Sequence, residues 1–170
     1  SSSSVYGGNK NLPFCETQSV DHPVSLYAST KKANELMAHS YSHLYDIPCT
    51  GLRFFTVYGP WGRPDMALFI FTKSMIAGEE INVFNEGNMF RDFTFIDDVT
   101  ECIFRCCFKP ATSCTNFDSS DPDPSISFAP HRIFNVGKNE PVDLLRFLEI
   151  MDENFDMKSI KEFDVYPSLF

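Results

Sequence analysis

The segment Ser25-Leu-Tyr-Ala-Ser-Thr-Lys-Lys32 decides the fold of this chain, because it sets Tyr27 and Lys31 four residues apart. On a helix, residues at this spacing share one face about one turn apart. The ammonium group can then lie under the same ligand as the phenol and favour its ionised form. The spacing alone is also typical of ordinary amphipathic helix surfaces, so its meaning depends on the rest of the sequence.

Four other stretches accompany this pair in a fixed order. They are Ser1-Ser-Ser-Ser-Val-Tyr-Gly7, Leu52-Arg-Phe-Phe-Thr-Val-Tyr-Gly-Pro-Trp-Gly-Arg-Pro-Asp-Met66, Asn85-Glu-Gly-Asn-Met-Phe-Arg-Asp-Phe-Thr-Phe-Ile-Asp-Asp98 and Phe134-Asn-Val-Gly137. With the Tyr27–Lys31 pair they resemble the extended short-chain dehydrogenase/reductase family. Within that family the chain is most similar to the UDP-glucuronate 4-epimerases, whose Pro-Trp-Gly-Arg-Pro-Asp-Met motif is intact at 60–66.

The resemblance implies an α/β fold: the C-terminal part of a Rossmann-type doubly wound sheet, plus most of a smaller substrate-binding α/β lobe. Residues 1–60 would belong to the NAD-binding domain and residues 61–170 mainly to the nucleotide-sugar-binding lobe, with the chain crossing between them. Family members begin with a glycine-rich turn that binds the dinucleotide pyrophosphate. No Gly-x-x-Gly-x-x-Gly occurs here. We therefore expect a fragment that is truncated at both ends.

Composition excludes several other classes of protein. A net charge of −9 argues against a nucleic-acid-binding surface. Hydrophobic residues make up 43% and charged residues 22%, which is typical of a globular domain, and no apolar run is long enough to span a membrane. The six cysteines form no C-x-x-C pair, so we predict no metal site and a reducing compartment such as the cytoplasm.

Apolar periodicity, proline and glycine predict alternating helices and strands. The expected helices cover residues 26–45, 67–77, 97–107 and 142–155. The expected strands cover residues 49–55, 81–84, 92–95 and 132–136, and residues 1–5 are expected to be extended. A long loop is expected at 110–130, and the last fifteen residues give no clear prediction. Strands that alternate with helices indicate the α/β class.

The resemblance assigns the chemistry to three residues in the first part of the chain. Tyr27 would be the base, Lys31 would stabilise the phenolate and bind the nicotinamide ribose, and Ser2 would hydrogen-bond the reacting sugar hydroxyl. Phe54 and Val57 would complete the contacts to NAD. A run of four serines is otherwise typical of a flexible linker, but the position of Ser2 in the matched motif favours the active-site interpretation.

The resemblance places the nucleotide sugar against six residues: Ser3, Ser4, Thr56, Arg63, Phe84 and Arg91. Arg63 would bind the sugar carboxylate or close the site, and Arg91 would bind the UDP diphosphate, since a guanidinium matches both anions. Arg63 could instead be a solvated loop arginine, and Arg91 could instead pair with Asp92 or Glu86. Phe84 is expected either to stack on uracil or to belong to the core.

Five residues at or near the matched motifs have structural or functional interpretations of their own. Thr56, at the carboxyl end of a strand, either contacts substrate or satisfies a loop. Arg53 is a third candidate for a bound phosphate, and Trp61 is expected to pack against the protein. Asp97 and Asp98 look like a catalytic carboxylate pair, but helix capping explains them better.

The residues at Ser3 and Ser4 distinguish between reactions. Nucleotide-sugar 4,6-dehydratases resemble this motif but carry Asp-Glu there, and UDP-glucuronate decarboxylases carry Glu at the position of Ser4. The chain has only hydroxyls at these positions, which favours an epimerase that needs a single base. The implied partners are NAD, a UDP-sugar and a second copy in a homodimer. Two alternatives stay open: an epimerase of the UDP-galactose type, or a non-catalytic remnant that at most binds UDP.

Overall fold

The computed structural model describes residues 1–164 and divides the chain into two compact units. The first unit comprises residues 1–55 and 96–137. The second comprises residues 56–95 and the described residues from 138 onward. The boundary expected near residue 60 lies close to the first crossing, and residues 96–137 return to the first unit. The assignment of the two units to a cofactor domain and a sugar lobe remains a prediction.

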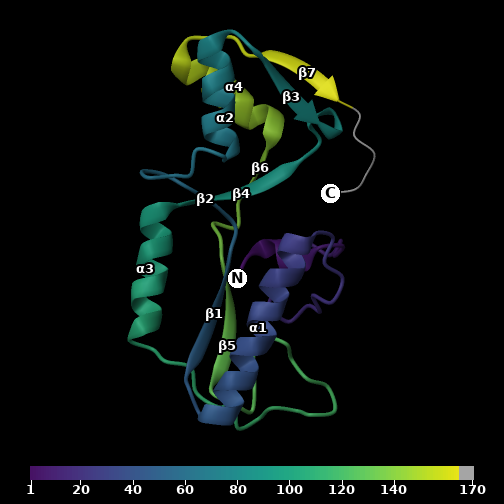
Figure 1. Cartoon of the computed structure of the whole chain (residues 1–170), viewed down its shortest axis with the longest axis vertical. Helices are drawn as coiled ribbons and strands as arrows, with labels where there is room; N and C mark the ends of the chain where they lie inside the picture. Colours follow the sequence, from purple (N-terminus) through teal and green to yellow (C-terminus); the bar gives the residue numbers. More distant parts are fainter. Residues whose placement is uncertain (165–170) are drawn as a thin grey trace. The chain divides into compact units, whose positions relative to one another are not determined.

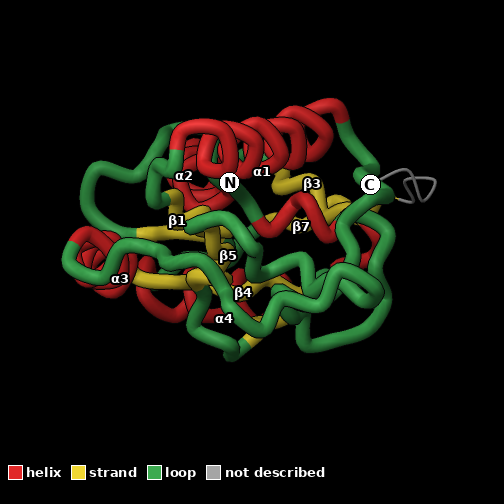
Figure 2. The backbone as a smooth tube through the Cα atoms, turned by 90° about the horizontal axis from the view of Figure 1, so that it is seen from below, coloured by secondary structure: helices red, strands yellow, loops and turns green. Residues whose placement is uncertain are grey.

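A pair of parallel strands forms the centre of the first unit. β1 (Cys49–Phe54) pairs with β5 (His131–Val136), with Cys49 opposite His131 and Phe54 opposite Val136. Helix α1 (Leu26–Tyr45) packs along these strands, as Figures 1 and 2 both show. Helix α3 (Ile96–Cys107) lies on the other side of the pair in Figure 1. Parallel strands beside helices confirm the predicted α/β class.

Helix α1 has the bounds that the sequence predicts. It begins at Leu26 because Ser25 is extended and its hydroxyl accepts a hydrogen bond from the backbone N–H of Ala28 at 3.1 Å. It ends at Tyr45, where Asp46 takes a left-handed conformation with φ 53°. Its buried residues recur every seven positions and include a charged one: Ala28, Glu35 and Ser42.

The serine-rich start of the chain is helical, so the prediction of an extended segment at residues 1–5 is wrong. A 3₁₀ helix, η1, covers Ser3–Tyr6. Ser2 is extended and caps it, because its hydroxyl accepts a hydrogen bond from the backbone N–H of Ser4 at 3.2 Å. Val5 and Tyr6 are buried in a small apolar cluster with Val20. This burial, together with the cap, outweighs the extended preference of the sequence.

The second unit contains a three-stranded sheet and a separate pair of strands. β2 (Thr56–Tyr58) lies parallel to β4 (Phe90–Phe95), which pairs antiparallel with β6 (Pro141–Asp143). β3 (Glu80–Phe84) pairs in parallel with β7 (Ile160–Asp164).

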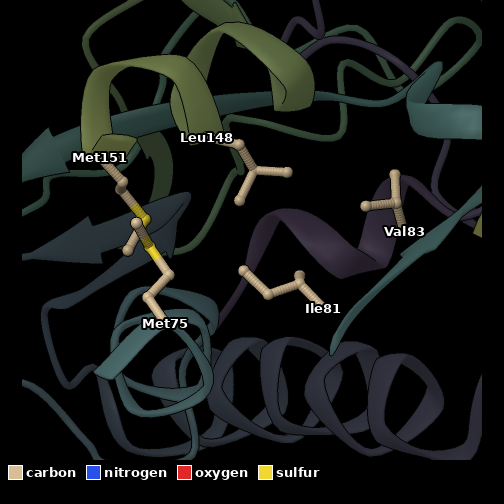
Figure 3. Close-up of a cluster of buried hydrophobic side chains, with 5 residues drawn as sticks. All are labelled: Met75, Ile81, Val83, Leu148 and Met151. Carbon is tan, nitrogen blue, oxygen red and sulfur yellow. The ribbon is translucent and has the colours of Figure 1, made fainter. Parts of the chain in front are cut away.

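Two helices and strand β3 enclose the core of the second unit. Helix α2 (Ala67–Ala77) ends at Gly78 as predicted, and helix α4 covers Leu144–Phe155. Alternate residues of β3 point into the core, as a half-buried strand requires. Figure 3 shows the buried cluster that these elements form: Met75, Ile81, Val83, Leu148 and Met151.

Two differences from the predicted elements concern the C-terminal part of the chain. Helix α4 begins at Leu144 and not at Val142, because Val142 pairs with Arg91 in the sheet and the carboxylate of Asp143 caps the helix. Strand β7 was not predicted.

A short 3₁₀ turn, η2 (Asn85–Gly87), joins the end of β3 to the stretch that leads into β4. The predicted long loop between α3 and β5 is confirmed, since residues 110–130 contain neither helix nor strand.

Candidate active site

Tyr27 and Lys31 lie in the first two turns of α1, close to each other. The Nζ atom of Lys31 is 5.3 Å from the centroid of the Tyr27 ring, and 55% of Tyr27 is exposed. Lys31 forms no ion pair with any carboxylate among residues 1–164, whereas its neighbour Lys32 pairs with Asp21 at 3.6 Å. The Lys31 ammonium therefore lies beside the phenol without a carboxylate partner in the described part of the chain, and the roles of base and supporting cation remain predictions.

Residues 1–6, the serine segment, pack against the same helix through η1. The hydroxyl of Ser2 already accepts one hydrogen bond, from the N–H of Ser4, and donates none within the described part of the chain. The Oγ atom of Ser4 is buried and has no hydrogen-bond partner among residues 1–164. A buried hydroxyl without a partner is costly, so Ser4 offers an unused donor at this position. Ser3 is partly buried beside it.

The backbone joins this segment to the end of β1. Ser2 forms an isolated parallel bridge with Phe54. The first unit therefore gathers the serine segment, the helix that carries the tyrosine–lysine pair, and Phe54. Six of the eleven predicted site residues lie in this unit: Ser2, Ser3, Ser4, Tyr27, Lys31 and Phe54.

Arg53 is not available to a phosphate, so its prediction as an anion-binding candidate is wrong. It is fully buried, and its guanidinium donates two hydrogen bonds of 2.9 Å to the two carboxylate oxygens of Glu35. Burial raises the pKa of Glu35, but the hydrogen bonds from Arg53 and Ser1 outweigh this and hold the pKa below its ordinary value. The charge of Arg53 is thus neutralised inside the protein.

The other five predicted residues lie in the second unit: Thr56, Val57, Arg63, Phe84 and Arg91. Strand β2 begins with Thr56 and Val57. They directly follow Phe55, where the 1–55 stretch of the first unit ends. Phe84 ends β3 and is 43% exposed, so it is not a core residue.

The two predicted binding arginines are both exposed. Arg63 lies 3.3 Å from the carboxylate of Asp65, and both side chains are about 70% exposed. Arg91 is in β4 and forms no ion pair with a carboxylate within residues 1–164. The carboxylate of Asp92 instead accepts hydrogen bonds from the backbone N–H groups of Lys138 and Asn139. Arg91 thus pairs with neither Asp92 nor Glu86, and its guanidinium has no carboxylate partner in the described part of the chain.

The structure also corrects the expectation for Trp61. This residue is fully exposed with φ 64°, so it does not pack against the described part of the chain. Asp97 and Asp98 lie in the first turn of α3, where carboxylates interact favourably with the positive end of the helix. Their position supports the structural interpretation of this pair.

Other kinds of site are not found within residues 1–164. Within them, no group of three or more His, Cys, Asp or Glu side chains is placed to hold a metal ion. No helix in this range combines the length and apolar character needed to cross a membrane. The six cysteines all lie within the range and have free thiols.

A family model described as the NAD dependent epimerase/dehydratase family matches residues 1–116, more than half of the chain. The chain belongs to this family. The match contains the serine segment, the Tyr27–Lys31 pair and both predicted binding arginines.

Individual relatives agree with the family. The chain is 54% identical over 168 residues to Protein CapI of Staphylococcus aureus, covering 98% of this chain and 50% of that protein. It is 48% identical over 154 residues to a probable UDP-glucuronate 4-epimerase of Rhizobium meliloti, covering 90% and 45%. A solved structure of UDP-glucuronic acid 4-epimerase from Bacillus cereus, in complex with UDP-glucuronic acid and NAD, is similar with a TM-score of 0.74 and 28% identity, over 97% and 47%. The chain thus spans about half the length of these relatives.

The residues on α1 fit the NAD that the family uses. A ribose and a carboxamide need donors and acceptors at short range, and the Tyr27 phenol and the unpaired Lys31 ammonium supply them. Phe54 and Val57 are partly buried apolar residues, and they belong to different units. Their contact with the cofactor remains a prediction.

Proposed function

We propose that the complete protein containing this chain is an NAD-dependent UDP-sugar 4-epimerase that interconverts UDP-glucuronate and UDP-galacturonate. The observation that carries the proposal is the Tyr27–Lys31 pair, whose cation forms no ion pair within residues 1–164, in a chain that belongs to the epimerase/dehydratase family. The relatives named as UDP-glucuronate 4-epimerases support the choice of sugar. The formation of a homodimer remains a prediction from the resemblance.

The reaction needs one base at the C4 hydroxyl of the sugar. The Tyr27 phenolate, stabilised by Lys31, takes the proton from this hydroxyl and returns it at the end of the cycle. Ser2 hydrogen-bonds the same oxygen and orients it towards the phenolate. Tyr27 and Lys31 would hold NAD⁺, which when bound would supply the redox chemistry, acceptance of hydride from C4 and its later return. Turning the sugar between these two transfers inverts the configuration at C4.

The sugar carboxylate needs ligands of its own, because a 4-ketouronate is a β-keto acid that loses carbon dioxide easily. We assign this role to Ser3, Ser4, Thr56 and Arg63, all of which can donate hydrogen bonds. The unused donor of Ser4 and the exposure of Arg63 support the assignment. Holding the carboxylate in the plane of the ketone keeps the bond to it from overlapping the carbonyl π system. Decarboxylation is then slow.

Arg91 and Phe84 complete the proposed site on the UDP side. The guanidinium of Arg91 is exposed and pairs with no carboxylate in the described part of the chain, which suits the diphosphate, and the half-exposed ring of Phe84 suits stacking on uracil.

Turnover assays on the complete protein test this function. UDP-glucuronate, UDP-glucose and UDP-N-acetylglucosamine are incubated separately with the enzyme, and the products are separated by anion-exchange chromatography. We expect UDP-galacturonate from UDP-glucuronate and much slower turnover of the neutral sugars. Preferred turnover of UDP-glucose would favour an enzyme of the UDP-galactose type. A complete protein that binds UDP but converts none of the three sugars would be a non-catalytic remnant.

A further inference from the structure

A buried ion pair lies in the first unit, two turns along α1 from the tyrosine. Arg53 is 0% exposed and Glu35 is 6% exposed. The Nε and Nη2 atoms of Arg53 each lie 2.9 Å from a different oxygen of Glu35, so the contact is bidentate. Two parallel hydrogen bonds fix the angle between the groups as well as their distance.

The pair holds the serine segment at both of its ends. On one side, the hydroxyl of Ser1 donates to Oε1 of Glu35 at 2.6 Å. On the other, Nη1 of Arg53 donates to the phenol oxygen of Tyr6 at 3.0 Å. Residues 2–4, which contain the predicted sugar-binding hydroxyls, lie between these two attachments.

Further contacts attach the same network to the strands. The phenol of Tyr6 donates to Oδ1 of Asn135, in β5, at 2.7 Å, and Arg53 itself belongs to β1. The backbone bridge between Ser2 and Phe54 lies one residue along β1 from Arg53. The network therefore connects η1, α1, β1 and β5 through directional bonds.

Stability alone does not account for a pair of this kind. Moving two charges out of water costs about as much free energy as their attraction returns, and apolar residues of similar volume often replace such pairs without loss of stability. Apolar contacts, however, allow neighbouring elements to slide and rotate, whereas a bidentate pair fixes one arrangement.

We infer that Glu35 and Arg53 are positioning residues that hold the serine segment against the helix carrying Tyr27 and Lys31. The inference rests on the proposed function, because it assigns the network to the geometry of that reaction. Ser2 and Tyr27 must reach the same sugar oxygen, and they belong to different elements. The ion pair ties these two elements together without touching the sugar.

The test uses the complete protein and the double variant Glu35→Met/Arg53→Met, which leaves no unpaired charge behind. The matched control is Glu101→Gln/Arg105→Gln, which removes an exposed pair from α3. We expect the buried variant to fold and to bind NAD and UDP-sugar within roughly threefold of wild type, while kcat falls at least about tenfold. The control should keep wild-type kcat. A kcat within about twofold of wild type in the buried variant overturns the inference.

A second measurement uses the amide hydrogens of η1, whose hydrogen bonds run from Val5 to Ser2 and from Gly7 to Ser4. Hydrogen exchange in peptides covering residues 2–8 should become at least about tenfold faster in the buried variant and stay unchanged in the control. Unchanged exchange in the buried variant contradicts the inference. Hydrogen exchange needs no turnover, so it tests the inference even if the wild-type protein is inactive. Inactivity of the wild type would overturn the proposed function, and exchange would still show whether Glu35 and Arg53 hold the serine segment.

A double-mutant cycle with Ser2→Ala separates positioning from a general loss of structure. If the pair aligns Ser2 with Tyr27, Ser2→Ala should lower kcat by about tenfold in the wild type but by less than roughly threefold in the buried variant. Equal effects in both backgrounds count against alignment. If the double variant fails to fold, the same double-mutant cycle is measured with Arg53→Lys in its place. This substitution keeps the positive charge and removes the bidentate contact.

Discussion

The Nε2 atom of His39, on α1, lies 2.7 Å from the Oγ atom of Ser127 in the long segment before β5. Ser127 is almost completely buried, and its carbonyl accepts a hydrogen bond from the backbone N–H of Cys114 at 2.8 Å. The ring of His131 packs edge-on against that of His39, with centroids 5.2 Å apart. Imidazole groups thus fix part of the 110–130 loop to the helix that carries Tyr27.

These contacts predict a loss of stability in mild acid. Burial, reinforced by His39, lowers the pKa of His131, and burial, reinforced by His43, lowers the pKa of His39. The unfolded chain therefore takes up protons before the folded one as the pH falls. The stability that neutral His39 and His131 contribute should be complete above about pH 6.5, the pKa of histidine in an unfolded chain. It should decline progressively below that pH.

Thermal unfolding of the complete protein between about pH 7.5 and 5.5 checks this expectation, since carboxylates titrate mostly below that window. The Tm should fall across the window, and His131→Gln should reduce the slope. His22→Gln, a change at an exposed histidine, should leave the slope as in the wild type. A Tm that is independent of pH in this window would contradict the prediction.

Removing the phenol tests the proposed base directly. Tyr27→Phe should lower kcat by about 10²- to 10⁴-fold, the usual contribution of a general base, and leave the affinity for UDP-glucuronate within a few-fold. The matched control is Tyr41→Phe on the same helix, where the ring is also more than half exposed. If Tyr27→Phe keeps more than about a tenth of wild-type kcat, Tyr27 is not the base.

Removing the cation should slow the proposed reaction. Lys31→Met takes away the ammonium that lies 5.3 Å from the centroid of the Tyr27 ring, so kcat should fall by at least about tenfold. Lys32→Met is the control, because that neighbouring lysine pairs with Asp21. A Lys31→Met variant whose kcat stays within about twofold of wild type would mean that Lys31 does not assist Tyr27.

Two glycines with a similar positive φ separate backbone strain from side-chain crowding in the second unit. Gly78 has φ 67° and open space around it, whereas a Cβ atom on Gly87, φ 78°, would lie 2.6 Å from a methyl carbon of Leu145. Gly78→Ala should cost about 1–2 kcal/mol from the left-handed backbone alone. Gly87→Ala should cost roughly 1–3 kcal/mol more, from overpacking against α4. Urea denaturation measures both, and equal losses would show that Leu145 moves aside freely.

Local signals explain why the regular elements could be predicted. Ser25 and Gly78 act on their own backbone neighbours, so the start of α1 and the end of α2 follow from the sequence. Strand β7 has the sequence Ile-Lys-Glu-Phe-Asp and carries no clear alternation. Its conformation comes from pairing with β3, some eighty residues earlier in the chain, which no local pattern encodes.

The same reasoning explains the errors at the candidate site. Arg53 looks like an anion ligand when read beside its sequence neighbours, but its partner Glu35 belongs to another element 18 residues away. Glu35 follows Lys31 by four residues in the sequence. This spacing indicates that both side chains lie on the same side of α1, and it is the signal that could have drawn attention to Glu35. Trp61 is expected to pack against the protein, whereas it has a positive φ of 64° and its side chain is fully exposed.

The final prediction concerns the choice of sugar and rests on Arg63. UDP-glucuronate and UDP-glucose differ at C6, where a carboxylate replaces a hydroxymethyl group. A hydrogen bond from a guanidinium to a carboxylate contributes about 1.5–3 kcal/mol, and its loss leaves the carboxylate without a charged partner. Arg63→Ala should therefore lower kcat/KM for UDP-glucuronate by roughly one to two powers of ten and barely change residual activity on UDP-glucose.

Arg146→Ala is the control for this variant, because Arg146 is also an exposed arginine of the second unit with acidic neighbours. It should leave both activities unchanged. Arg63→Ala should also release UDP-pentose, since a loosely held ketouronate can rotate its carboxylate to the angle at which carbon dioxide leaves. Chromatography of the products detects this leak. If both sugars lose activity equally, Arg63 serves the loop or the diphosphate, and the preference for a uronate must come from the hydroxyls of Ser3, Ser4 and Thr56.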